Sequence, residues 1–90
     1  MAEISETDLA KARIAVGALM EELGITAHLY AVEPRGGVWV VIVECATESG
    51  WQRAELQAGA ELLDAIHGDV KAMKTLVNNW RQHLAACKRG

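Results

Sequence analysis

The hydrophobic and polar positions of residues 6–23 repeat with the period of an α-helix. Its apolar positions share one face: Leu9, Ala12, Val16, Leu19 or Met20, and Leu23. Ser5 suits the N-cap, and Gly24 suits the left-handed residue that follows a helix C-terminus. The pattern therefore predicts a helix at 6–23.

Two β-strands are predicted next, at 25–33 and 38–45. The first alternates between two faces, and the second is rich in valine and isoleucine and stays apolar on both faces as far as Glu44. Between them, the sequence PRGG at 34–37 favours a turn, because proline fixes φ and glycine permits positive φ. We expect a hairpin and not a phosphate-binding loop, since these glycines lead into a strand and not into a helix N-terminus.

The two faces of this hairpin differ in bulk. A four-residue turn at 34–37 pairs Leu29 with Ile42 and Ala31 with Val40, and this flatter face is expected to lie against helices. The other face is bulkier and mixed, with His28, Tyr30, Val32, Trp39, Val41 and Val43. If the chain does not cover that face itself, another molecule must.

Two further helices are predicted, at 50–67 and 70–88. Ser49 and Gln52 form a capping box for the first. Its apolar stripe is Trp51, Ala54, Ala58, Leu62 and Ile66. The second has apolar residues at heptad spacing: Val70, Met73, Val77, Trp80, Leu84 and Cys87. This run is too short for a free-standing coiled coil, so it indicates packing along a neighbouring helix or a partner's helix.

The predicted order, helix–strand–strand–helix–helix, places the chain in the α+β class as a single small domain of residues 1–90. Two strands form a ribbon only about as wide as one helix, so three amphipathic helices cannot share one of its faces. Either the helices sandwich the hairpin, or two chains complete it to a four-stranded antiparallel sheet. The second arrangement predicts a homodimer. Its candidate interface residues are Tyr30, Trp39, Val41, Val43, Val77, Trp80 and Leu84.

Charge adds an alternative function. The 90 residues carry a formal net charge of -3: residues 1–68 hold four basic and eleven acidic side chains (-7), and residues 69–90 hold five basic and one acidic (+4). Helix 70–88 has a basic polar face that a DNA-binding regulator would use: Lys71, Lys74, Asn78 and Arg81. The negative total disfavours nucleic acid as a partner.

The N-terminus and the cysteines indicate a compartment. The first residues are acidic and lack the basic and apolar regions of a signal peptide, and no apolar run approaches the ~20 residues of a membrane helix. We therefore expect a cytoplasmic protein with no membrane contact. Cys45 and Cys87 are expected to be buried thiols rather than a disulfide.

Candidate catalytic groups are few. Cys45 and His28 lie on adjacent predicted strands, but a nucleophile pair also needs an orienting group and an oxyanion site. The three histidines lack the spacing of zinc ligands. Glu44 and Glu48 precede the helix at 50–67, where acids are favoured electrostatically. The sequence predicts no catalytic residue, metal site or cofactor. It predicts a non-enzymatic accessory, assembly or regulatory factor that binds a second copy and an unknown protein partner.

Overall fold

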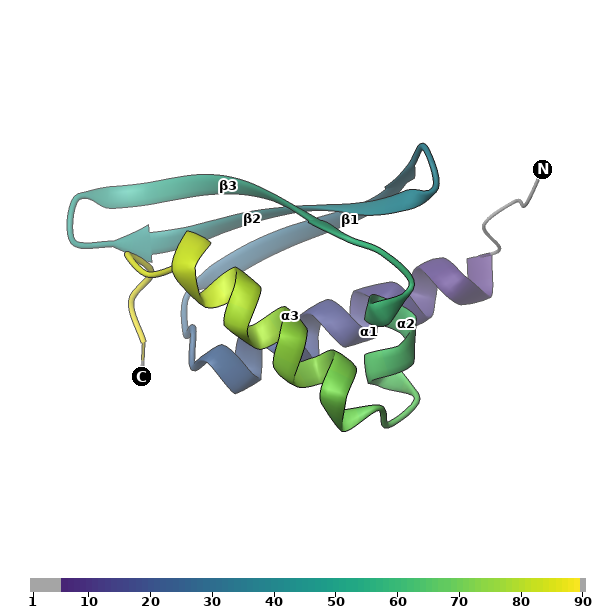
Figure 1. Ribbon diagram of the computed structural model, residues 1–90. Coiled ribbons are helices and arrows are strands. Elements are labelled where there is room, and N and C mark those ends of the chain that lie inside the picture. The colour runs from purple at the N-terminus through teal and green to yellow at the C-terminus, as the bar shows by residue number, and fades with distance from the viewer. Residues whose placement is uncertain (1–5, 90) are drawn as a thin grey trace.

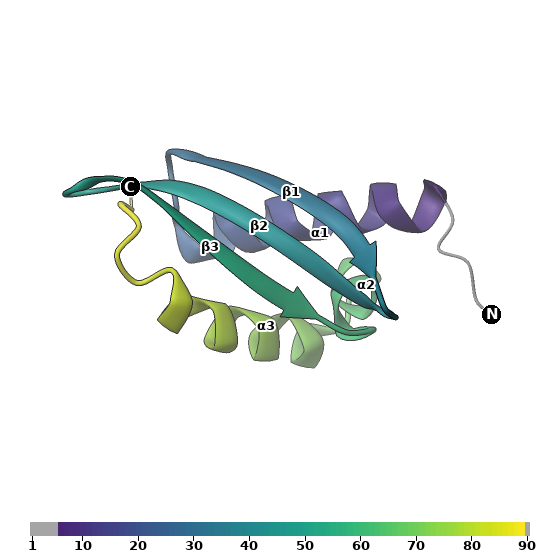
Figure 2. The ribbon, with the colours of Figure 1, turned by 90° about the horizontal axis from the view of Figure 1, so that it is seen from above.

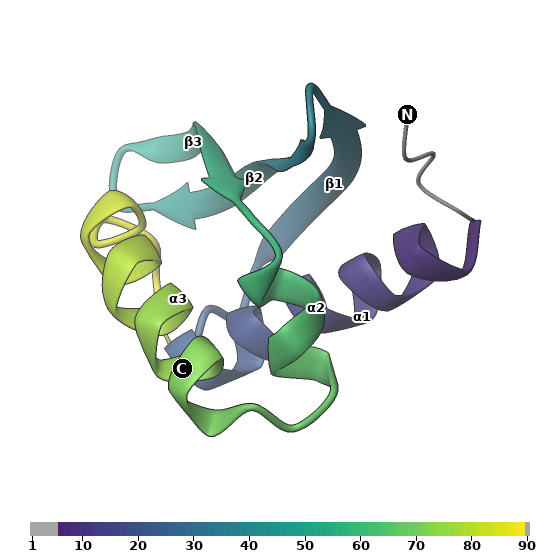
Figure 3. The ribbon, with the colours of Figure 1, turned by 45° about the vertical axis from the view of Figure 1, so that its right-hand side comes forward.

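A computed structural model describes residues 6–89 of the chain. The elements, in order, are α1 (Glu6–Leu23), β1 (His28–Arg35), β2 (Val38–Thr47), β3 (Gly50–Ala58), α2 (Glu61–Ile66) and α3 (Val70–His83). The strands form one antiparallel sheet in the order β1-β2-β3, and the helices lie together on one side of it (Figures 1 and 3). The expected α+β class is confirmed, with one strand more than expected. The proposed N-cap, Ser5, lies outside the described residues.

The prediction of a helix over 50–67 is wrong, because residues 50–58 form β3 and only Glu61–Ile66 are helical. Side chains of β3 alternate between solvent and the helices, and those turned inward end in the buried Leu56 and Ala58. Ser49 does not cap a helix. It lies in the turn between β2 and β3, where its backbone N–H donates to Thr47 Oγ1. A central strand that is apolar on both faces needs a neighbour on each edge, and β3 supplies the second one for β2.

The β1–β2 hairpin is tighter than predicted. Gly36 and Gly37 alone form the turn, with φ of 58° and 83°. Positive φ at both central residues is the requirement of a type I′ turn, which matches the twist of the flanking strands. Ala31 therefore pairs with Ile42 instead of Val40. Because the shift is two residues, each side chain stays on its predicted face.

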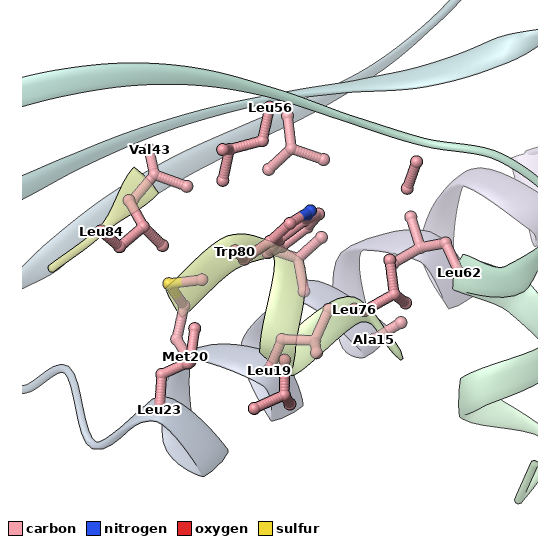
Figure 4. Packing of buried hydrophobic residues seen from close by; sticks show 14 of the residues in the cluster. Ala15, Leu19, Met20, Leu23, Val43, Leu56, Leu62, Leu76, Trp80 and Leu84 are labelled. Atoms are coloured by element: carbon pink, nitrogen blue, oxygen red, sulfur yellow. The ribbon is translucent and has the colours of Figure 1, made fainter. Parts of the chain in front are cut away.

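The helices cover the face that was expected to be open. Trp39, Val41 and Val43 lie beneath them, at 5%, 0% and 0% exposure, whereas Ala31 on the other face is exposed. With β3 added, the sheet is wide enough for all three helices to share one face. The larger side chains of that face bury more apolar area than alanines would. The core is centred on Trp80, which lies between the sheet and α1 (Figure 4).

The segment after α3 returns to the sheet. The helix ends at His83, before the predicted end at residue 88. The backbone N–H of Lys88 donates to the carbonyl of Ala46 at 2.8 Å. This brings Cys87 to Cys45, and the two form a disulfide with a Cα–Cα distance of 5.5 Å. The prediction of two free thiols is therefore wrong, because their distance in sequence hid their closeness in space.

Candidate interaction surfaces

Most of the predicted interface residues lie in the core of the single chain. Six of the seven are at most 7% exposed: Trp39, Val41, Val43, Val77, Trp80 and Leu84. The chain's own helices and third strand thus supply the burial that was expected from a partner, and these six side chains are not available on the surface. Tyr30 is the exception, at 37% exposure.

Within residues 6–89, the opposite side of the sheet carries no helix, and we call it the open face (Figures 1 and 2). By register, its side chains are Leu29, Ala31, Glu33, Arg35, Val38, Val40, Ile42, Glu44, Ala46, Trp51, Arg53, Glu55 and Gln57. Leu29 and Trp51 are 64% and 62% exposed. Val40 is only 1% exposed, because Glu33 and Gln57 stand opposite it on the two neighbouring strands. The open face therefore presents large apolar groups to solvent.

Charged residues of the open face are matched in sign. Arg53 stands opposite Glu44. Arg35 forms ion pairs with Glu33 and, at 3.8 Å, with Glu55. These exposed pairs contribute little to stability. Glu33 and Arg35 lie at the hairpin end of β1, and the other open-face residues of this strand, Leu29 and Ala31, are uncharged.

The suggested role of Glu44 and Glu48 changes with the fold. Glu44 belongs to β2 on the open face, and Glu48 lies in the turn between β2 and β3. No helix begins there, so the explanation from helix N-terminal electrostatics is wrong. The two carboxylates are also not directed at a shared site, since Glu44 faces Arg53 across the sheet.

Apolar exposure also gathers where β1 meets α1. The Tyr30 hydroxyl donates to the carbonyl of Arg13 at 3.2 Å, and the Tyr30 ring stacks on His28 with centroids 5.9 Å apart. A Cβ on Gly17 would lie 3.0 Å from the same hydroxyl, so glycine provides the room for Tyr30. Ile14, next to Arg13 on α1, is 60% exposed. We call Ile14, Gly17 and Tyr30 the β1–α1 edge.

The basic residues of α3 form a solvent-exposed face, as the sequence indicates. Lys71, Lys74, Asn78 and Arg81 are all exposed. The opposite face of the helix is buried against the rest of the domain through Leu76, Val77 and Trp80. The polar face is thus accessible to a partner of opposite charge.

Cys45 and His28 are neighbours on adjacent strands, as predicted, but they are unsuited to catalysis. His28 stands directly opposite Cys45, but the sulfur of Cys45 is bonded to that of Cys87. His28 Nδ1 lies 3.2 Å from the carbonyl of Ile25. A disulfide sulfur holds no thiolate with which to act as a nucleophile. Within residues 6–89, no group of three or more histidine, cysteine, aspartate or glutamate side chains gathers in a metal-binding arrangement.

Sequence reasoning missed Trp51 as a surface residue. It was assigned to the buried stripe of a helix, whereas it lies on β3 with its side chain in solvent. The alternation of polar and apolar residues over 53–58 was the signal for a strand, and its continuation puts Trp51 on the same outward side as Arg53 and Glu55. A helical spacing of apolar residues in the same stretch hid this alternation.

No protein-family model matches the chain, and neither a curated protein nor a solved structure matches it. In the part of the chain that the structure describes, no helix combines the length and the apolar character needed to cross a membrane.

Proposed function

We propose that the protein is a non-catalytic interaction module that acts as a homodimer, as an accessory, assembly or regulatory factor. One observation carries the proposal. The core is closed by the chain's own elements, yet large apolar side chains remain exposed on the open face and on the β1–α1 edge. Leu29 and Trp51 are on the open face, and Ile14 and Tyr30 are on the β1–α1 edge; Val70, at the start of α3, is exposed as well. Exposed apolar groups that cluster on a folded domain indicate a binding surface.

The two exposed regions suit two kinds of contact. The open face offers apolar groups, including Leu29 and Trp51, among paired charges such as Arg53 and Glu44. An apolar centre with a polar surround is the usual composition of a protein–protein interface. The open face is therefore our candidate surface for a different protein partner. The β1–α1 edge is the candidate for self-association.

A DNA-binding regulator is the alternative function, and the exposed polar face of α3 is the observation in its favour. The net charge of -3 opposes it, because attraction to a phosphate backbone depends on the summed field of the protein. A salt-sensitive, sequence-selective shift of duplex DNA by the wild-type protein would favour this alternative over the interaction module.

A cytoplasmic location remains a prediction. The Cys45–Cys87 disulfide counts against it, because disulfides persist mainly in oxidising compartments.

Light scattering of the wild-type protein at micromolar concentration tests self-association. We expect a mass near twice the 9.7 kDa of the chain. A single species of 9.7 kDa that persists at high concentration would contradict the homodimer.

A further inference from the structure

The outer edge of β1 has unpaired backbone groups. Ala46 N–H donates to the carbonyl of Ala27, so the odd-numbered residues of β1 face β2. The N–H and C=O groups of His28, Tyr30 and Val32 therefore point away from the sheet. Within residues 6–89, the outward N–H groups of Tyr30 and Val32 make no hydrogen bond. An edge of this kind is a template for another strand.

This edge is protected only at one end. Pro34 occupies the next outward position, where its missing N–H is tolerated because no strand lies beside it. Residues 25–32 carry no formal charge, so no lysine or acidic side chain before Glu33 disfavours pairing with another strand. The free segment is therefore residues 28–32.

The other edge of the sheet is different. On β3, the outward backbone groups belong to Trp51, Arg53, Glu55 and Gln57, two of which are charged. Beyond β3 lies α3, with its basic face exposed (Figure 2). Charged side chains and a like-charged neighbouring helix both disfavour symmetric pairing there.

The helix beneath β1 suits a second copy. Seen from above, α1 crosses under β1, and its N-terminal half emerges past the outer edge of the strand (Figure 2). Ala10, Ile14 and Gly17 fall at i, i+4 and i+7 of this helix and share one face. Gly17 lies beside the Tyr30 hydroxyl, so this face is on the β1 side. Ala10 and Ile14 are exposed on this face and available to another helix, whereas the space beside Gly17 is filled by Tyr30 of the same chain.

We propose that two copies of the chain pair antiparallel through residues 28–32 of β1, with their α1 helices packed antiparallel beneath. The inference deepens the proposed function and rests on its homodimer. Two three-stranded sheets would join into one of six strands, in place of the four-stranded sheet that the sequence suggested. Strand pairing supplies main-chain hydrogen bonds, and the β1–α1 edge supplies apolar area.

Side chains select the register, which we centre on Tyr30. His28 then pairs with Val32 of the second copy, and Leu29 meets Ala31 on the open face. A register centred on Ala31 would put Leu29 against Glu33 and His28 against Pro34, which has no N–H to donate. A register centred on Leu29 would need Thr26, which lies outside β1.

Charge complementarity between the two α1 helices supports the same axis. The Tyr30 hydroxyl lies beside Gly17, so an axis through Tyr30 passes near Gly17 of both helices. In an antiparallel pair centred there, Arg13 faces Glu21 of the second copy, four residues from the centre on each side. Both side chains are exposed in the single chain. The arrangement thus gives two ion pairs, each between Arg13 of one copy and Glu21 of the other.

Light scattering across a dilution series tests the proposal with matched variants. Ile14→Glu places a charge in the α1 contact and should raise the dimer dissociation constant at least tenfold. Val70→Glu is the control, since Val70 is also a helical residue and is 65% exposed, but lies away from this edge. It should remain dimeric. Circular dichroism establishes that both variants are folded.

A charge exchange separates the ion pairs from general surface effects. Arg13→Glu and Glu21→Arg should each weaken the dimer severalfold, and the double exchange should restore it. If the wild type is a dimer but Ile14→Glu remains one, or the double exchange fails to restore association, the proposed pairing is wrong and the homodimer stands. A monomeric wild type would instead overturn the homodimer itself.

Discussion

At the scale of residues, Cys45 and Cys87 form a covalent link between two distant segments. Their disulfide ties the end of β2 to the segment after α3 across a sequence separation of 42. A cross-link of this span removes conformational freedom from the unfolded chain. The bond thus stabilises the return of the C-terminal segment to the sheet, where Lys88 meets Ala46.

Removal of this bond should destabilise the fold. For a loop of this length, the chain-entropy estimate is a loss of about 4 kcal/mol in the free energy of unfolding. Denaturant unfolding with and without reductant measures the loss. The Cys45→Ala/Cys87→Ala variant is the control, and its free energy of unfolding should be the same with and without reductant. Two titratable thiols in the oxidised, folded wild type would contradict the bond.

At the scale of elements, α1 occupies the range expected from its pattern, whereas the local pattern of β3 fits a strand and a helix equally. The helical spacing of Trp51, Ala54 and Ala58 overlaps a strand alternation over 53–58, so the sequence alone leaves the choice open. The choice is made by β2, whose two apolar faces and two edges need covering. That need is non-local, and it appears only when the three strands are placed together.

Proline substitution distinguishes the strand from the helix that was predicted. The N–H of Ala54 points toward β2, and that of Glu55 points away from it. Ala54→Pro should therefore lower the free energy of unfolding by about 1 kcal/mol more than Glu55→Pro, the worth of one ladder hydrogen bond. Urea unfolding of both variants checks this. Equal losses would be expected of a helix interior and would contradict β3.

At the scale of the whole molecule, the sequence divided the hairpin side chains correctly between two faces but chose the wrong face for the core. The choice depended on the width of the sheet, and a two-stranded ribbon cannot hold three helices on one side. The missed strand therefore also caused the loss of the candidate interface, because Trp39, Val41 and Val43 became core. Tyr30 alone kept an exposed position, since it lies at the edge beside α1.

The width of the sheet also determines which surfaces stay free for binding. Helices on one face leave the other face open, and a three-stranded sheet has two free edges. One edge carries charges on β3, and the other, at β1, is neutral over residues 25–32. Our central proposal is that a second copy of the chain pairs with the neutral edge at β1.

Amide hydrogen exchange of the wild-type protein, compared between dilute and concentrated samples, tests this claim most directly. The outward amides of Tyr30 and Val32 should become protected as concentration rises, because each gains an acceptor on the second copy. The outward amides of Arg53 and Glu55 on β3 should exchange rapidly in both samples and serve as the internal reference. If the amides of Tyr30 and Val32 exchange in the concentrated sample as fast as those of Arg53 and Glu55, a second copy does not pair with β1.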